Sequence, residues 1–141
     1  MPEIRRAIAA DAEQLFALTR DFATSFTVGR PAFDSSFGAL LLQEDALLLV
    51  SDDGESLQGY VLGFDHETLF AGGPVAWVEE LMVREDSRRQ GIGECLMQAF
   101  EAWAQVRGDK LVALATRRAA DFYTAISYEE SATYFRKLLP G

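Results

Sequence analysis

A short basic segment with two glycines is the part of the chain best suited to chemistry. It is Arg88-Arg89-Gln90-Gly91-Ile92-Gly93, and it lies between an apolar run at 75–83 and a helical pattern that begins at Ile92. Glycines let the backbone approach a ligand closely, and the first N–H groups of a helix have no acceptor inside the helix. With the helix dipole and two arginines beside them, these groups predict a site for an anion such as a phosphate.

Two common nucleotide-binding motifs do not fit this segment. A Walker A loop needs Lys and then Ser or Thr directly after its second glycine, where this chain has Glu94 and Cys95. A dinucleotide-binding fingerprint needs Gly or Ala where this chain has Leu96. The anion is therefore expected to be held by a different motif.

Two adjacent carboxylates interrupt the apolar run that precedes the basic segment. Because successive residues of a strand point to opposite faces, Glu79 is expected to share a face with Trp77, Leu81 and Val83, and Glu80 with Met82. A carboxylate can take the proton of a bound ammonium group. The alternative is that both glutamates mark a strand irregularity and pair with Arg or Lys.

The elements that position these residues follow from the hydrophobic pattern. Apolar runs predict strands at 3–8, 46–50, 57–64, 75–83 and 110–115, with one or two more within 128–138. Helical spacing predicts helices from Asp11, from Asp34 or Ser35, from Gly91 to Gly108, and over 117–125. The predicted fold is one domain over 1–141, of the α/β (α+β) class, with a mixed, mostly antiparallel central sheet and helices on both faces.

Composition excludes several classes of protein. A net charge of -9 argues against general nucleic-acid binding, which needs clustered Lys and Arg. The chain has no apolar run long enough to span a membrane and no secretory signal, so a cytoplasmic location is expected. The single Cys95 permits no internal disulfide and no cysteine zinc site, so no metal is expected and Cys95 is predicted to lie in the core. The single His66 is predicted in a solvated loop.

Two motifs carry a resemblance to a known family. Arg88-x-x-Gly91-x-Gly93 follows Glu80-Leu-Met-Val83, and Ala119-x-x-Phe-Tyr123 follows about thirty residues later, after the expected helix and strand. This arrangement resembles the GNAT superfamily of N-acetyltransferases. Two positions depart from the family pattern: Arg117 stands where many members have Asn, and Ser127 replaces the usual Gly.

The resemblance implies acetyl-CoA as the cofactor. The backbone of Leu81, Met82 and Val83 would bond the pantetheine arm, and Arg117 lies where many members contact the cofactor. The pyrophosphate would be held by the amides of Arg88, Arg89, Gln90, Gly91, Ile92 and Gly93.

The resemblance also implies a reaction. Acetyl transfer to a primary amine of a small molecule or peptide would use Tyr123 as the acid that protonates the leaving thiolate. Glu79 is favoured slightly as base and Glu80 as substrate contact. The segment 26–37 is expected to line the acceptor pocket, and a homodimer is common in similar proteins. The alternative is a non-catalytic, regulatory module that binds acyl-CoA.

Overall fold

The computed structural model describes residues 2–23 and 26–141 of the chain. Within these residues the strands are β1 (Glu3–Arg6), β2 (Ala46–Asp52), β3 (Leu57–Thr68), β4 (Gly73–Val83) and β5 (Val112–Leu114). The α-helices are α1 (Ala12–Phe22), α2 (Arg30–Leu42), α3 (Ile92–Val106) and α4 (Ala120–Ala125), with short 3-10 turns η1 (Ala9–Asp11) and η2 (Glu85–Ser87).

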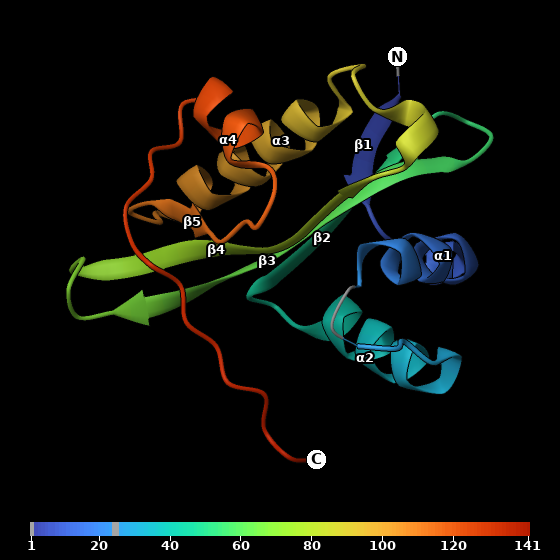
Figure 1. Ribbon diagram of the computed structural model, residues 1–141, viewed down its shortest axis with the longest axis horizontal. Coiled ribbons are helices and arrows are strands. Elements are labelled where there is room, and N and C mark those ends of the chain that lie inside the picture. Colours follow the sequence, from blue (N-terminus) through green and yellow to red (C-terminus); the bar gives the residue numbers. More distant parts are fainter. Residues whose placement is uncertain (1, 24–25) are drawn as a thin grey trace.

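The strands form one mixed sheet in sequence order. Strands β1 to β4 are antiparallel neighbours, and β5 joins β4 in the parallel direction after the α3 crossover. Helices α3 and α4 cover one face of the sheet, and α1 and α2 cover the other (Figure 1). The predicted fold class is therefore confirmed. No helix in the described ranges is long and apolar enough to cross a membrane.

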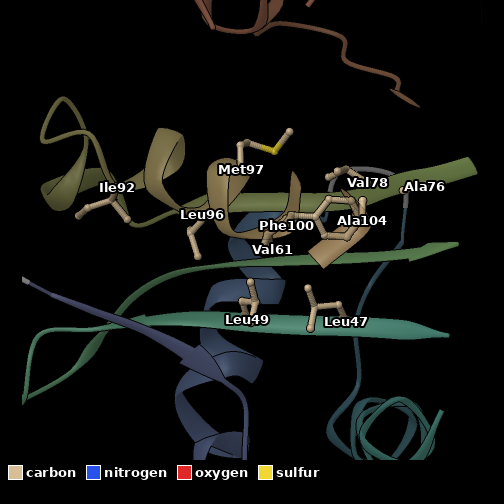
Figure 2. Close-up of a cluster of buried hydrophobic side chains, with 10 residues drawn as sticks. All are labelled: Leu47, Leu49, Val61, Ala76, Val78, Ile92, Leu96, Met97, Phe100 and Ala104. Carbon is tan, nitrogen blue, oxygen red and sulfur yellow. The ribbon is translucent and has the colours of Figure 1, made fainter. Parts of the chain in front are cut away.

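Alternating side chains of the central strands supply two apolar cores. Leu47 and Leu49 of β2 point toward α3, where they meet Leu96 and Phe100 (Figure 2). Val50, one residue further on, packs with α1 and α2 on the opposite face. Ile92, Leu96 and Phe100 are buried on the face predicted from their spacing, because a helix on a sheet buries one apolar stripe. Met97 and Ala104 are also buried, whereas Ala99 and Trp103, predicted on the same face, are only partly buried.

A β-bulge in β4 overturns one predicted alternation. Leu62 pairs with Glu80, but the next residue of β3, Gly63, pairs with Val78, so Glu79 is an extra residue in β4. A bulge shifts the two-residue alternation by one position. Leu81 and Val83 therefore face α3, as Val78 does, while Trp77 faces the other way. The prediction that Trp77 and Leu81 share a face is wrong for this reason.

The predicted strands within 128–138 are absent, because residues 126–141 form no helix or strand. A strand needs the backbone of a neighbour, and β5 offers an edge of only three residues. The segment 126–141, named here the C-terminal tail, leaves α4, passes β4 where Tyr134 stacks on Trp77, and ends away from the sheet (Figure 1). Large apolar side chains on it are exposed, namely Tyr134, Phe135, Leu138 and Leu139.

Smaller differences have local causes. Helix α2 begins at Arg30, earlier than predicted, because Pro31 fits the first helical turn instead of breaking the chain. His66 is exposed, as expected, but it lies in β3, which extends past its predicted end. Cys95 is only partly buried and lies outside the α3 core, so its predicted core position is wrong.

Candidate functional site

One edge of β4 is open where the sheet splits. Strand β5 pairs with β4 only from Ala76 to Val78, while β3 continues along the opposite edge as far as Val83. The bulge at Glu79 bends β4 at the point where the β5 ladder ends. Backbone N–H and C=O groups of residues 79–83 that point away from β3 therefore have no strand partner among the described residues. The Val83 carbonyl accepts a hydrogen bond from Arg88, and the other groups can pair with an extended ligand.

The segment after β4 presents free amide groups beside that edge. Arg89 and Gly91 both adopt left-handed backbone conformations, with φ of 66° and 80°. The Cys95 N–H donates to the Gly91 carbonyl at 3.0 Å, so the N–H groups of residues 92–94 precede the first intrahelical bond. Arg88 lies alongside, and its Nε donates to the Val83 carbonyl at 3.0 Å. These groups form a positive concavity suited to a phosphate.

Helix α4 closes on this concavity through a tight contact. A Cβ built on Gly93 would lie 3.2 Å from Cζ of Phe122 and 3.7 Å from Cγ2 of Val83. The second glycine of the motif therefore allows close packing between α3 and α4, and a larger side chain there would require Phe122 to shift by a few tenths of an ångström. Arg117 is exposed in the loop before α4, and the neighbouring Thr116 hydroxyl accepts the Ala119 N–H at 3.0 Å.

Tyr123 lies on α4, against the core under α3. Its ring packs edge-on against Phe122, with centroids 4.9 Å apart, and against Tyr128, at 5.8 Å. Burial raises the pKa of the Tyr123 hydroxyl to about 12. The phenol is therefore neutral and able to donate a proton at neutral pH, and no hydrogen bond engages it among the described side chains.

On the opposite face of β4, Glu80 is held by a tyrosine. The Tyr60 hydroxyl donates to Oε1 of Glu80 at 2.6 Å. Burial raises the pKa of the Glu80 carboxyl, and the hydrogen bond from Tyr60 opposes this change. Sequence reasoning missed Tyr60, although a lone hydroxyl inside an apolar strand is a sign of a buried polar partner.

Glu80 faces a small cavity between the sheet and helices α1 and α2. The cavity has a volume of about 90 Å³. Its walls are formed by Leu15, Thr19, Phe33, Ser36, Phe37, Leu40, Leu48, Tyr60, Leu62 and Glu80. The predicted pocket segment 26–37 thus contributes Phe33, Ser36 and Phe37. Within the described ranges, no cluster of His, Cys, Asp or Glu is placed to hold a metal ion.

Glu79 has different surroundings from Glu80. Its side chain is exposed, and Oε1 accepts a hydrogen bond of 3.2 Å from the Trp77 indole. Trp77 in turn stacks on Tyr134 of the C-terminal tail, with ring centroids 6.2 Å apart. The two predicted carboxylates are therefore separated by environment, one at the bulge in solvent and one in the cavity.

The chain was compared with known families and solved structures. A model of the acetyltransferase (GNAT) family matches residues 12–128. A comparison with curated protein sequences gives no significant match.

Several solved structures share the fold over almost their whole length. A transcriptional regulator from Bacillus halodurans C-125 has a TM-score of 0.89 and 22% identity, and the match covers 99% of this chain and 100% of that one. Glucosamine-6-phosphate N-acetyltransferase from Arabidopsis thaliana has a TM-score of 0.87 and 15% identity, with 99% of both chains covered. An aminoglycoside N-acetyltransferase in complex with CoA has a TM-score of 0.84 and 17% identity, with 97% and 95% covered. These identities establish the fold alone, whereas the family match spans most of the sequence. The chain therefore belongs to the acetyltransferase (GNAT) family.

Proposed function

We propose that the protein transfers the acetyl group of acetyl-CoA to a primary amine of a small molecule or peptide by direct attack. The observation that carries this proposal is the split in the sheet. The open edge of β4 lies between a proton donor, Tyr123, on the α3 face and a carboxylate, Glu80, on the opposite face. A donor placed along that edge has an acid on one side and a base on the other.

The donor fits the groups that β4 and α3 leave unpaired. An extended pantetheine arm matches the open edge at Leu81, Met82 and Val83, because strand-like pairing needs alternating N–H and C=O groups. The pyrophosphate matches the positive concavity formed by residues 88–93. Arg117, exposed in the loop before α4, adds charge within reach of a polyanionic donor. Acetyl-CoA supplies the activated acetyl group, and these residues hold and orient it.

Glu80 is the better candidate for the base. It lines the cavity between the sheet and helices α1 and α2, and burial raises the pKa of its carboxyl, which makes it a stronger base. One of its oxygens is held by Tyr60, which leaves the other for the amine. Glu79 is exposed at the bulge, where it is suited to attract an ammonium group. This reverses the slight preference from sequence, in which Glu79 was the base.

Tyr123 is suited to the acid role. The amine nitrogen forms a bond to the acetyl carbon as the carbon–sulfur bond breaks, and the electron pair of that bond goes to sulfur. The amine proton goes to Glu80, and the Tyr123 hydroxyl donates its proton to the leaving thiolate. A thiol has a pKa of about 8.5, below the value of about 12 for the buried Tyr123 hydroxyl, so Tyr123 stabilises the charge that develops on sulfur in the transition state, and solvent then restores the phenol.

Thermal unfolding with acetyl-CoA, CoA and ATP tests the donor site. Binding to the folded state alone stabilises it by about 2.7 kcal/mol at a hundredfold excess over the dissociation constant. We expect a higher midpoint with both CoA compounds and no change with ATP. An unchanged midpoint at millimolar acetyl-CoA would remove the donor site and with it the proposed reaction.

Thiol release with an amine acceptor tests the catalytic groups. Loss of a general acid or base typically costs about 10²–10⁴-fold in rate. We expect such losses for Tyr123→Phe and Glu80→Gln with donor stabilisation retained, and a smaller loss for Glu79→Gln, the matched control. Equal losses in the two glutamine variants would contradict the assignment of Glu80 as the base.

A second candidate function is a regulatory module that binds acyl-CoA without efficient transfer. It is favoured by the similarity to a protein described as a transcriptional regulator. This function predicts stabilisation by acetyl-CoA in the same unfolding experiment, but no thiol release with any amine. Tyr123 and Glu80 would then be replaceable without loss of ligand binding or of the regulatory effect.

A further inference from the structure

The cavity at Glu80 is mostly apolar. Six of its lining residues carry hydrocarbon or phenyl side chains: Leu15, Phe33, Phe37, Leu40, Leu48 and Leu62. The polar lining side chains are Thr19, Ser36, Tyr60 and Glu80. Because the Tyr60 hydroxyl already donates to Glu80, the end of the cavity at β4 offers one carboxylate to a ligand. A ligand inserted there meets one negative charge, the hydroxyl groups of Thr19 and Ser36, and otherwise apolar side chains.

Positive side chains lie near the aromatic wall of the cavity. Phe33 stacks on Phe37 and meets Phe16 edge-on, with centroids 5.6 and 5.4 Å apart. The guanidinium carbons of Arg20 and Arg30 lie 5.0 and 5.5 Å from the centroid of the Phe16 ring. Arg30 is paired with Asp34, whereas Arg20 forms no ion pair with the described residues. An acceptor with several ammonium groups would be repelled here, because like charges in a partly desolvated site destabilise binding.

The cavity is also small. Pockets that enclose a whole small molecule measure roughly 300–1,000 Å³, and this one is about 90 Å³. It has room for an aminoalkyl end or a compact ring, and none for a sugar amine with its hydroxyl groups. Hydroxyl groups placed against Leu48, Leu62 and the phenyl rings would also lose their hydrogen bonds to water, at a cost in affinity.

We propose that the acceptor is an apolar primary monoamine, an alkylamine or arylalkylamine, bound with its nitrogen at Glu80 and its hydrocarbon between α1, α2 and β2. This inference rests on the proposed acetyl transfer and specifies its acceptor. The hydrocarbon is held by Phe33, Phe37 and Leu40, and it replaces water in the cavity. Acceptor affinity then comes from apolar burial, and orientation comes from the single carboxylate.

A series of linear amines tests the acceptor class. Each buried methylene contributes about 0.8 kcal/mol, or about fourfold in kcat/KM. Thiol release from acetyl-CoA is measured with ethylamine, butylamine, hexylamine, phenethylamine, spermidine, kanamycin and glucosamine 6-phosphate. We expect kcat/KM to rise about fourfold per methylene from ethylamine until the cavity is full. The values for the longer monoamines should exceed those for spermidine, kanamycin and glucosamine 6-phosphate by at least about tenfold. The proposal would be overturned by equal kcat/KM values along the series, by a higher kcat/KM for a polyamine or sugar amine, or by no acetylation of any monoamine.

Substitution at the cavity wall gives a second, independent test. Ser36 lines the cavity and is exposed, while its neighbour Ser35 is exposed and lies outside the lining. We expect Ser36→Asp to raise the ratio of kcat/KM for 1,6-diaminohexane over hexylamine by about tenfold, and Ser35→Asp to leave it unchanged. Equal ratios in both variants would show that the amine does not occupy this cavity.

The unfolding midpoint with acetyl-CoA is recorded on every sample. If acetyl-CoA stabilises the protein and thiol is released, but the monoamines react equally or a polyamine or sugar amine reacts faster, only the acceptor class is wrong. If acetyl-CoA stabilises the protein and no amine of the series releases thiol, the proposed transfer fails and the regulatory module is favoured. If acetyl-CoA gives no stabilisation, the proposed function itself fails, and the acceptor class with it.

Discussion

Removing one hydroxyl from the Tyr60–Glu80 pair changes both the stability and the pH dependence of the protein. In Tyr60→Phe the phenyl ring still fills the buried position, but Oε1 of Glu80 loses its donor at 2.6 Å. A hydrogen bond to a charged group contributes about 1.5–3 kcal/mol, and a buried carboxylate without a partner is costly. The free energy of unfolding is therefore expected to fall by about 2 kcal/mol near pH 8.

The sign of the pH effect follows from the pKa of Glu80. Burial raises this pKa, and the Tyr60 hydrogen bond lowers it, so removing the hydroxyl raises it further. The lost hydrogen bond stabilised the ionised carboxylate, so the destabilisation of Tyr60→Phe is largest above the folded-state pKa of Glu80. The destabilisation decreases as the pH falls through the folded-state pKa of Glu80, and it is smallest below the unfolded-state pKa, where the carboxyl is neutral in both states. Urea unfolding of both proteins at several pH values measures this difference.

The same substitution reports on catalysis. If Glu80 is the base, the acidic limb of kcat/KM against pH marks its pKa in the free enzyme. That limb should move to higher pH in Tyr60→Phe. Tyr128→Phe is the matched control, because the Tyr128 hydroxyl donates to Glu101 at the same distance, 2.6 Å, on the other face of the sheet. It should lower stability by a similar amount without moving the limb. A limb that stays in place in Tyr60→Phe despite lower stability would refute Glu80 as the titrating base.

Three further predictions concern packing, buried charge and assembly. Gly63→Ala places a Cβ against the Phe100 ring and 2.6 Å from the Trp77 carbonyl oxygen, so it should lower the free energy of unfolding by about 2 kcal/mol or more. Gly38→Ala, in open space on α2, should be neutral or stabilising, and urea unfolding measures both changes. Burial and the nearby Asp65 raise the pKa of Asp109 to about 6, so the protein should lose stability as the pH rises from about 4 to about 6. Asp109→Asn should stabilise it more at about pH 8 than at about pH 5, and an equal effect at both would contradict the raised pKa. The homodimer stays a prediction, and the exposed apolar side chains of the C-terminal tail favour it. Sedimentation should show that the parent protein is a dimer and that the double variant Leu138→Asp with Leu139→Asp is a monomer. A monomeric parent protein would refute the prediction.

Sequence periodicity predicted the parts of the fold that depend on local pattern. The α3 stripe is visible because residues on one face of a helix recur every three or four positions, and the structure buries Ile92, Leu96 and Phe100 as that rule requires. The class of the fold followed from the order of the elements. The C-terminal strands were predicted wrongly because apolar character in 128–138 does not specify which backbone, if any, pairs with it.

The sequence predicted the anion-binding part of the candidate site, but it did not predict the pairing of Tyr60 with Glu80. The anion site depends on neighbouring residues, from Arg88 to Gly93, so its spacing is readable in the sequence. The pair of Tyr60 and Glu80 joins β3 to β4 across twenty positions. Its existence depends on strand register, and register depends on the bulge at Glu79. A strand irregularity at the two glutamates was one of the sequence alternatives, but residue types do not specify which glutamate enters the cavity and which is exposed.

The extra residue at Glu79 has two consequences that place donor and acceptor on either side of one strand. In a regular strand that kept Glu79 in the alternation, Glu80 would be two residues after Val78 and would face α3, in the apolar cluster with Leu96 and Phe100. In the bulged strand, Glu80 pairs with Leu62 and faces α1, α2 and the cavity, and the bulge coincides with the end of pairing to β5. The edge that is open beyond this point is the one proposed to hold the donor. The bulge at Glu79 therefore keeps the proposed base on the acceptor face at the position where the donor edge opens, because a bulge both shifts the alternation and disrupts the ladder.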